Sequence, residues 1–301
     1  MCWRRPGAGR CCRACRKCAR HWICRQRRAE GRALRGGYDR AFVLPNSLKS
    51  ALIPFWAGVP VRTGWRGEMR YGLLNDVRKL DKERYPLMVQ RFVALALDAD
   101  APPPPLETIQ PPRLRVDSDA VAAARADQRL ADDRPVLGLC PGAEFGPSKR
   151  WPEYHYAAVA RHWIGQGGRV WLFGSAKDRP VAEQIIEALP EAQRGEAAIL
   201  AGATSLEQAV DLLSVTDAVV SNDSGLMHIA AALGRPLVAV YGSTSPGFTP
   251  PLGEAVAIER LGLECSPCFQ RECPLGHLNC LRQLEPDRVI QALARLPGVP
   301  R

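Results

Sequence analysis

Long hydrophobic runs are missing from this 301-residue sequence. No apolar stretch approaches the ~20 residues that a membrane-spanning helix needs. No apolar segment follows the basic N-terminus, as a secretory signal would require. Hydrophobic residues make up 46% and charged residues 24% of the chain, which excludes wholesale disorder. The sequence therefore predicts a cytoplasmic globular protein of about two domains.

Basic residues outnumber acidic ones only in the first 37 residues, although the whole chain has a net charge of +10. Residues 1–37 contain 12 Lys and Arg against a single acid, Glu30, whereas residues 38–301 contain 29 basic and 30 acidic residues. A nucleic-acid-binding domain is expected to carry its basic surface on the folded body. We therefore expect no nucleic-acid partner for the body of the chain.

Aliphatic residues are equally scarce in residues 1–37, where Ile23 and Leu34 are the only members of the Val, Ile and Leu group. Such a segment cannot bury enough apolar surface to offset the entropy of ordering it. Six of the 11 cysteines also lie here, before residue 25. We interpret residues 1–37 as a disordered or spurious arm, with a metal site and a nucleic-acid contact as the alternatives.

The remaining cysteines are predicted to be thiols or metal ligands rather than disulfides, because a secretory signal is missing. Cys140 stands alone. The other four follow the pattern C-x2-C-x4-C-x6-C, with His277 inside it: Cys265, Cys268, Cys273 and Cys280. These intervals differ from the two separated C-x2-C knuckles of a zinc ribbon. Three interpretations stay open for this cluster: structural thiols, a structural metal site and a redox role.

A proline-rich stretch divides the chain. Residues 98–119 include four consecutive prolines, which cannot continue a helix and favour an extended connector. Around it the sequence predicts a strand over 41–45, a helix over 46–58 that Pro54 ends or kinks, and helices over 84–97 and 118–131. The predicted domains are an incomplete first domain over 38–132 and a second domain over 133–301.

The second domain alternates apolar strands with helices of about 10–15 residues. Strands are predicted over 136–140, 169–173, 198–200, 218–221 and 236–242. Helices are predicted over 153–166, 178–189, 205–214 and 225–233, the third opening on a capping box of Thr204 and Glu207. This order is typical of an α/β fold with a doubly wound parallel sheet. Ligands of such sheets bind at the carboxyl ends of the strands.

Two loops at predicted strand ends suit an anion. The loop GAEFGPSKRWP lacks the spacing of a P-loop, but its backbone amides and Lys149 can face a phosphate. The segment SNDSGLMHIAAALG places Asp223 or Ser224 as the cap of a helix and Gly225 in its first turn. His228 lies one turn beyond Ser224 on the same side. A third loop, YGSTSPGFTPP, is rich in hydroxyl groups but is a weaker signal.

Several long blocks together resemble glycosyltransferase family 9. The blocks are residues 46–92, PGAEFGPSKRWP, FGSAKD, SNDSGLMHIAAALGRPLVAVYGSTSP and CSPCFQRECPLGHLNC. The resemblance runs from about Gly37 to the C-terminus. It implies a GT-B fold, in which two Rossmann-like doubly wound domains face a cleft. The first domain then takes the lipid acceptor and the second takes the nucleotide sugar.

The reaction that the resemblance implies is the inverting transfer of heptose from ADP-heptose to the first heptose of the lipopolysaccharide inner core. The acceptor would be lipid A–Kdo–heptose, met at the cytoplasmic face of the inner membrane, and no metal or cofactor is expected. Expected donor-binding residues are Lys149, Ser175, Thr204, Asp223, Ser224, Gly225 and His228. Expected acceptor-side residues, the basic side chains around Trp65, are Lys49, Arg62, Arg66 and Arg70.

The N-terminus departs from the family. Family members begin with a strand and a loop of the type GPSWVGDMVMAQ, whose Asp is the general base, and residues 1–37 contain no Asp. The catalytic base is therefore unassigned, with Asp76 and Glu68 as acids to test. Two other interpretations remain: a nucleotide-sugar-binding family member with impaired catalysis, and a nucleic-acid- or metal-binding module that acts through the arm.

Overall fold

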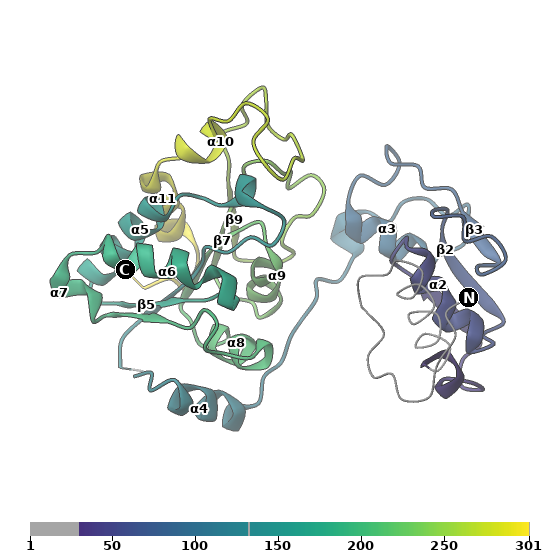
Figure 1. Cartoon of the computed structure of the whole chain (residues 1–301), viewed down its shortest axis with the longest axis horizontal. Helices are drawn as coiled ribbons and strands as arrows, with labels where there is room; N and C mark the ends of the chain where they lie inside the picture. The colour runs from purple at the N-terminus through teal and green to yellow at the C-terminus, as the bar shows by residue number, and fades with distance from the viewer. Residues whose placement is uncertain (1–29, 132, 301) are drawn as a thin grey trace, which may run out of the picture. The chain divides into compact units, whose positions relative to one another are not determined.

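The computed structural model describes residues 30–131 and 133–300. The chain divides into two compact units between Ile109 and Gln110 (Figure 1). This division falls inside the proline-rich stretch 98–119 that the sequence predicts as a connector. The helix predicted over 118–131 therefore belongs to the second unit, whereas the predicted domain border was drawn after it. Most of the arm, residues 1–29, lies outside the described residues.

The first unit is built on a small parallel sheet of order β1-β2-β3. Its strands are Arg40–Val43 (β1), Val61–Trp65 (β2) and Asp76–Arg78 (β3). Its helices include Leu48–Trp56 (α2), Met88–Ala94 (α3) and the 3-10 turn Leu106–Thr108 (η1), and residues 30–33, the described start of the unit, are also helical. The predicted strand and both predicted helices are present with shorter bounds. Strands β2 and β3 were not predicted.

Helix α2 shows how Pro54 is accommodated in the first unit. The Ser47 hydroxyl caps its start by accepting the Ser50 N–H. Pro54 has no N–H to donate back to the preceding turn, and the helix ends two residues later at Trp56. Ala51 then packs with Val43 and Leu74 in a small buried cluster. The predicted effect of Pro54 on the end of this helix is thus consistent with the observed bounds.

The second unit is a six-stranded parallel sheet of order β6-β5-β4-β7-β8-β9. The strands are Val136–Cys140 (β4), Arg169–Leu172 (β5), Ala197–Ile199 (β6), Ala218–Asn222 (β7), Leu237–Val240 (β8) and Val256–Glu259 (β9). The helices are Ser118–Asp127 (α4), Glu153–Gly165 (α5), Arg179–Glu187 (α6), Glu191–Arg194 (α7), Leu206–Leu213 (α8), Gly225–Ala232 (α9), Asn279–Arg282 (α10) and Pro286–Arg295 (α11), with 3-10 turns at Pro147–Lys149 (η2) and Ala176–Asp178 (η3).

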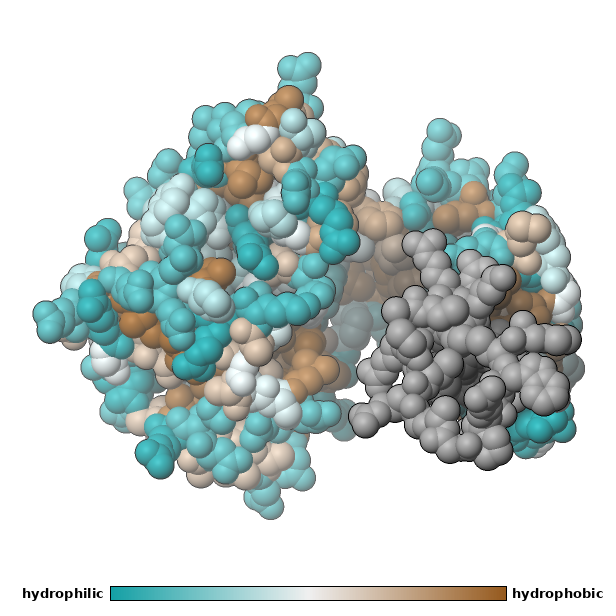
Figure 2. Space-filling view, viewed as in Figure 1, coloured by the Kyte–Doolittle hydropathy of each residue, from teal (hydrophilic) through white to brown (hydrophobic). Residues whose placement is uncertain are grey.

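Each face of this sheet carries its own layer of helices. Leu137 and Leu139 of β4 pack into a core with α5, α6 and α11. Val136 and Cys140 of the same strand point the other way, into a core with α4, α8 and α9 (Figure 1). This alternation follows from the two-residue period of a strand. On the visible face of the unit, hydrophobic residues show only as small patches among hydrophilic ones (Figure 2).

The strand order has one reversal. The chain runs outward through β4, β5 and β6, then crosses back to pair β7 with β4 and continues outward through β8 and β9. The crevice at the carboxyl ends of β4 and β7 is therefore the topological switch point of the sheet. Open parallel sheets bind their ligands at such a point. The predicted doubly wound α/β sheet is confirmed.

Two details of the second unit differ from the sequence prediction. Helix α8 is capped by Ser205, whose hydroxyl accepts the Gln208 N–H, so the predicted capping box of Thr204 and Glu207 is wrong by one residue. Both pairs have the spacing of a capping box, and Ser205 is the residue in extended conformation. Strand β9 and helices α7, α10 and α11 were not predicted. In the described part of the chain, no helix is long and apolar enough to cross a membrane.

Candidate active site

Three loops converge at the switch point of the second unit. The Lys149 Nζ lies 2.6 Å from the Asp223 Oδ2, which joins the loop after β4 to the loop after β7. The Thr244 hydroxyl, from the loop after β8, donates to the same oxygen at 2.6 Å. The Lys149 and Asp223 side chains are 15% and 6% exposed. The expected phosphate-binding lysine is therefore already half of a largely buried ion pair.

The buried side chain of Asn222 holds two of these loops in position by hydrogen bonds. Its Nδ2 donates to the Pro141 carbonyl at 2.6 Å. Its Oδ1 accepts the Trp151 N–H at 3.1 Å and the Tyr156 hydroxyl at 3.0 Å. One fully buried amide thus ties the end of β7 to both ends of the loop that carries Lys149. Sequence analysis missed Asn222, because a polar residue closing an apolar strand resembles an ordinary loop residue.

The N-terminus of helix α9 opens beside the Lys149–Asp223 pair. Ser224 is its N-cap residue by backbone geometry, but its hydroxyl lies 3.3 Å from the Ser221 hydroxyl and caps no amide. Asp223, the other expected cap, is engaged by Lys149 and Thr244 instead. A Cβ added to Gly225 would meet no atom within 4 Å. The first-turn N–H groups therefore have no side-chain cap, and the backbone at Gly225 has no side chain against it, which suits an anion.

His228 belongs to the same electrostatic environment. Desolvation lowers the pKa of its imidazole; the Asp223 charge acts to raise it, and the Lys149 charge lowers it further. The residue as a whole is nevertheless exposed, so its side chain is accessible to a ligand. His228 is therefore neutral at pH 7 and can donate or accept a hydrogen bond. The structure therefore brings together, at the switch point, four residues that the sequence predicted: Lys149, Asp223, Gly225 and His228.

The loop after β4 also carries an aromatic side chain, Phe145, next to the site. The Phe145 ring lies 5.0 Å from the Lys149 Nζ and 5.8 Å from the Arg271 guanidinium carbon. Cations over an aromatic face are attracted by its quadrupole. Phe145 thus holds two cations near the site, and neither Phe145 nor Arg271 was singled out from the sequence.

The other expected donor residues lie at neighbouring strand ends. Ser175, after β5, donates through its hydroxyl to the Asp178 carboxylate at 2.7 Å. The same oxygen accepts the Ser175 N–H, which closes the turn η3 before helix α6. Thr204, after β6, donates to the Leu200 carbonyl at 3.2 Å. Both therefore lie on the β5–β6 side of the sheet edge, and both hydroxyls already have protein partners.

The expected acceptor-side residues of the first unit divide into two kinds. Arg70 is 2% exposed, and its guanidinium donates to the carbonyls of Pro45, Trp65 and Gly67. Burial lowers the pKa of this guanidinium. Arg62 donates to the carbonyls of Leu73 and Val59, both at 2.6 Å. These two arginines stabilise the first unit from within, whereas Lys49 and Arg66 are exposed.

The two acids named as substitutes for the general base are both held by protein groups. Asp76 accepts the Thr63 hydroxyl at 2.8 Å and pairs with Arg78 at 3.0 Å. The hydrogen bond from Arg78 lowers the pKa of Asp76, which makes its carboxylate a weak base. Glu68 accepts the Leu48 N–H at 2.6 Å. Asp76 is therefore engaged through both carboxylate oxygens, whereas the Glu68 side chain is exposed.

Comparison with known proteins decides the family. The sequence profile of glycosyltransferase family 9 (heptosyltransferase) matches residues 27–279. The chain belongs to glycosyltransferase family 9. It is a glycosyltransferase by this membership, and the predicted resemblance is confirmed.

Individual relatives and a solved structure agree with the family. The chain is 50% identical over 275 residues to the lipopolysaccharide heptosyltransferase 2 of Salmonella typhimurium, a match that covers 90% of this chain and 79% of the relative. The protein of that name from Escherichia coli matches equally well. The structure of the E. coli ADP-heptose lipopolysaccharide heptosyltransferase II superposes with a TM-score of 0.80 at 49% identity, over 89% of this chain and 80% of that one.

These matches confirm the fold that the sequence predicts, in which both units carry parallel α/β sheets as in the GT-B heptosyltransferases. They give no support to the interpretation of a family member with impaired catalysis. The interpretation of a binding module acting through the arm concerns residues that lie largely outside the described part of the chain. Thr244 is the further site residue that sequence analysis missed, although its loop had been noted for its hydroxyl groups.

Proposed function

We propose that this chain transfers heptose from ADP-heptose to the first heptose of the lipopolysaccharide inner core, with inversion at the anomeric carbon. The observation that carries the proposal is the 50% identity, over 90% of the chain, to relatives named lipopolysaccharide heptosyltransferase 2. A match of this extent spans both units. The acceptor is lipid A–Kdo–heptose, and the enzyme works at the cytoplasmic face of the inner membrane.

The donor diphosphate binds at the switch point, against the first turn of α9 and Lys149. Negative charge grows on the ADP as its bond to the sugar breaks. Amides at a helix N-terminus and a partly desolvated ammonium group stabilise that charge more strongly in the transition state than in the ground state. Asp223 holds the Lys149 ammonium in place, and His228 donates its N–H to a phosphate or sugar oxygen.

The adenosine part lies on the β5–β6 side of the same sheet edge, near Ser175 and Thr204. The resemblance to glycosyltransferase family 9 puts the adenine near Thr204, and the loops after β5 and β6 lie on one side of the diphosphate along the same sheet edge. The Asp178 carboxylate, which already accepts two hydrogen bonds from Ser175, is the nearest acid for a ribose hydroxyl.

The anionic acceptor contacts the first unit through Lys49 and Arg66, the two exposed members of the basic set. Arg62 and Arg70 act indirectly, by holding the strands and loops from which those side chains project. Surface charges of this kind steer an anionic substrate and are sensitive to ionic strength.

A transfer assay tests the proposal. Purified full-length chain is incubated with ADP-heptose and a heptose-I-terminated, Kdo-containing acceptor, and the product is weighed by mass spectrometry while ADP release is followed. The expected product carries one additional heptose, linked with inverted anomeric configuration. An acceptor that ends before the first heptose is the matched control and should stay unmodified. Release of ADP without a heavier acceptor would contradict the proposal.

A further inference from the structure

The segment before helix α10 has few apolar contacts; Leu261 and Leu263 pack against the main core of the second unit as partly buried residues. Residues 260–278 form neither helix nor strand, and none of them is buried. Phe269 and Leu278 nevertheless both adopt a left-handed backbone conformation at φ 54°. Bulky residues pay about 1–3 kcal/mol for such a conformation, so the surrounding structure must fix it. Folded segments that lack a core are usually held by disulfides or by a metal ion.

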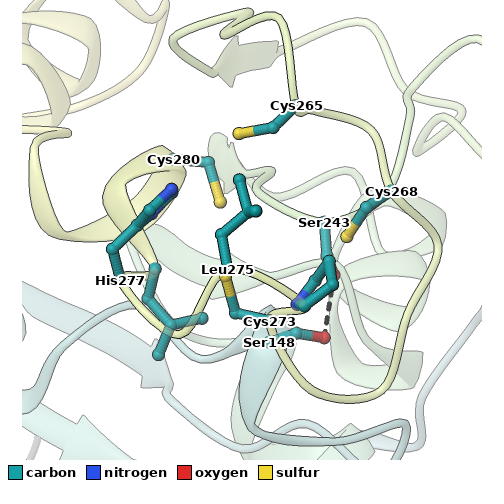
Figure 3. A pocket seen from close by; sticks show the side chains of 10 residues that line it. Ser148, Ser243, Cys265, Cys268, Cys273, Leu275, His277 and Cys280 are labelled. Atoms are coloured by element: carbon teal, nitrogen blue, oxygen red, sulfur yellow. Dashed lines mark hydrogen bonds between the residues drawn. The ribbon is translucent and has the colours of Figure 1, made fainter.

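Three cysteines of this segment and Cys280 of helix α10 line one small pocket (Figure 3). The pocket has a volume of about 20 Å³. That volume is enough for a single ion or water molecule and too small for an organic ligand. Figure 3 shows the cysteine side chains around the pocket with Leu275 among them. The cysteines are Cys265, Cys268, Cys273 and Cys280, and all four are free thiols.

We propose that these four cysteines form a tetrathiolate site for one thiophilic divalent ion, Zn²⁺ or Fe²⁺. Four thiolates in a tetrahedron are the ligand set that such ions prefer. Among residues 30–131 and 133–300, no three His, Cys, Asp or Glu side chains already stand in position to hold a metal. Binding therefore requires the thiols to turn inward about their χ1 bonds.

The same segment braces the loops of the donor site. The Phe269 N–H donates to the Ser243 carbonyl at 2.7 Å, next to Thr244. The Ser148 N–H donates to the Arg271 carbonyl at 3.2 Å, and the Ser148 hydroxyl donates to the Gln270 carbonyl at 2.5 Å. These contacts come from the residues between Cys268 and Cys273. An ion bound by Cys268 and Cys273 fixes both ends of the stretch between them. It therefore also holds Ser148 and Ser243 in place, which are the neighbours of Lys149 and Thr244 in the chain.

Metal analysis of the full-length chain tests the site. The protein is purified under reducing conditions, and its Zn and Fe content is measured by plasma mass spectrometry. We expect about one ion per chain, in line with a single four-coordinate site. We also expect a Co²⁺-substituted form to show thiolate charge-transfer and tetrahedral d–d absorption bands. Cys265→Ser and Cys273→Ser should each lose the ion.

Two control variants separate this site from the other cysteines. Cys140→Ala removes a buried strand thiol whose pKa is raised to about 12 by burial, which makes it no metal ligand. A Cys15→Ser/Cys18→Ser double variant removes two thiols of the arm. Both controls should keep the ion. If a cysteine variant of the segment fails to fold, stepwise modification of the thiols in the unmutated protein should release the ion together with labelling of these four cysteines.

Three results would overturn the site: a chain that takes up neither Zn²⁺, Fe²⁺ nor Co²⁺, an ion that both segment variants retain, or disulfides among the four cysteines under reducing purification. Hydrogen exchange tests the bracing separately and does not depend on the proposed activity. Removal of the ion should accelerate exchange in residues 142–150. Unchanged exchange there would show that the ion holds only its own loop.

Discussion

Replacing Lys149 by Met separates its two roles in the site. The side chain pairs with Asp223 and is expected to contact the donor diphosphate. Loss of a hydrogen bond to a charged group costs about 1.5–3 kcal/mol. The affinity for ADP should therefore fall about 10- to 150-fold. The fall should not depend on the sugar, because ADP alone carries the diphosphate.

The same change leaves the Asp223 carboxylate, which is 6% exposed, without its cation. Breaking a fully buried ion pair costs about 3–5 kcal/mol. The Lys149 side chain is 15% exposed, and Thr244 still donates to Asp223, so the expected cost is lower, about 2 kcal/mol. For a unit of this size, that corresponds to a fall in Tm of roughly 4–8 °C.

The double variant Lys149→Met/Asp223→Asn distinguishes the two effects. A neutral amide at 223 can still accept the Thr244 hydroxyl and needs no cation, so most of the lost stability should return. The ADP affinity should stay low. Calorimetric titration with ADP and thermal unfolding are measured on all four proteins of the cycle. The reasoning would be refuted by unchanged ADP affinity in Lys149→Met, or by recovery of ADP affinity together with stability in the double variant.

The remaining predictions concern four other residues. Asn222→Ala should lower the free energy of unfolding by about 2–3 kcal/mol in denaturant titrations, because it removes the partner of the buried Trp151 N–H and Pro141 carbonyl. Equal stability would show that the loops are held otherwise. Because its lowered pKa leaves His228 neutral at pH 7, a bound diphosphate should raise that pKa and drive proton uptake. ADP affinity should therefore increase from pH 8 to pH 6 by up to about tenfold per unit of pKa change, more steeply than in His228→Gln; parallel pH profiles would contradict this. Arg66→Glu should raise the KM for the acceptor about fivefold without changing Tm. Arg70→Met should lower the free energy of unfolding by about 3 kcal/mol. A loss of stability in Arg66→Glu, or a raised KM at unchanged stability in Arg70→Met, would contradict these roles.

The sequence predicted the second unit better than the first because its signals differ in strength. Strands β4, β5, β7 and β8 are runs of apolar residues buried on both faces, which stand out against the helices between them. Strand β2, VRTGW, contains Arg62 and Gly64 and has no such pattern. Its arginine donates to the carbonyls of Val59 and Leu73, an arrangement that the local sequence does not indicate.

The residues of the candidate site also differ in how far the sequence could predict them. Lys149 and Asp223 could be proposed separately, because each follows a predicted strand. Their contact joins residues 74 positions apart and depends on β4 pairing with β7, which the order of strands along the chain does not determine. The roles of Asn222 and Thr244 also depend on that pairing. The sequence therefore indicated the chemistry of the loops, and the strand order decided which side chains meet.

A crystal structure of the chain with ADP tests most directly whether the donor site lies at the switch point of the second unit. The account predicts the diphosphate at the first turn of helix α9, with the Gly225 and Leu226 N–H groups and the Lys149 Nζ in hydrogen-bonding distance of its oxygens. Adenosine should extend toward Ser175 and Thr204. A diphosphate bound away from both α9 and Lys149 would contradict the account.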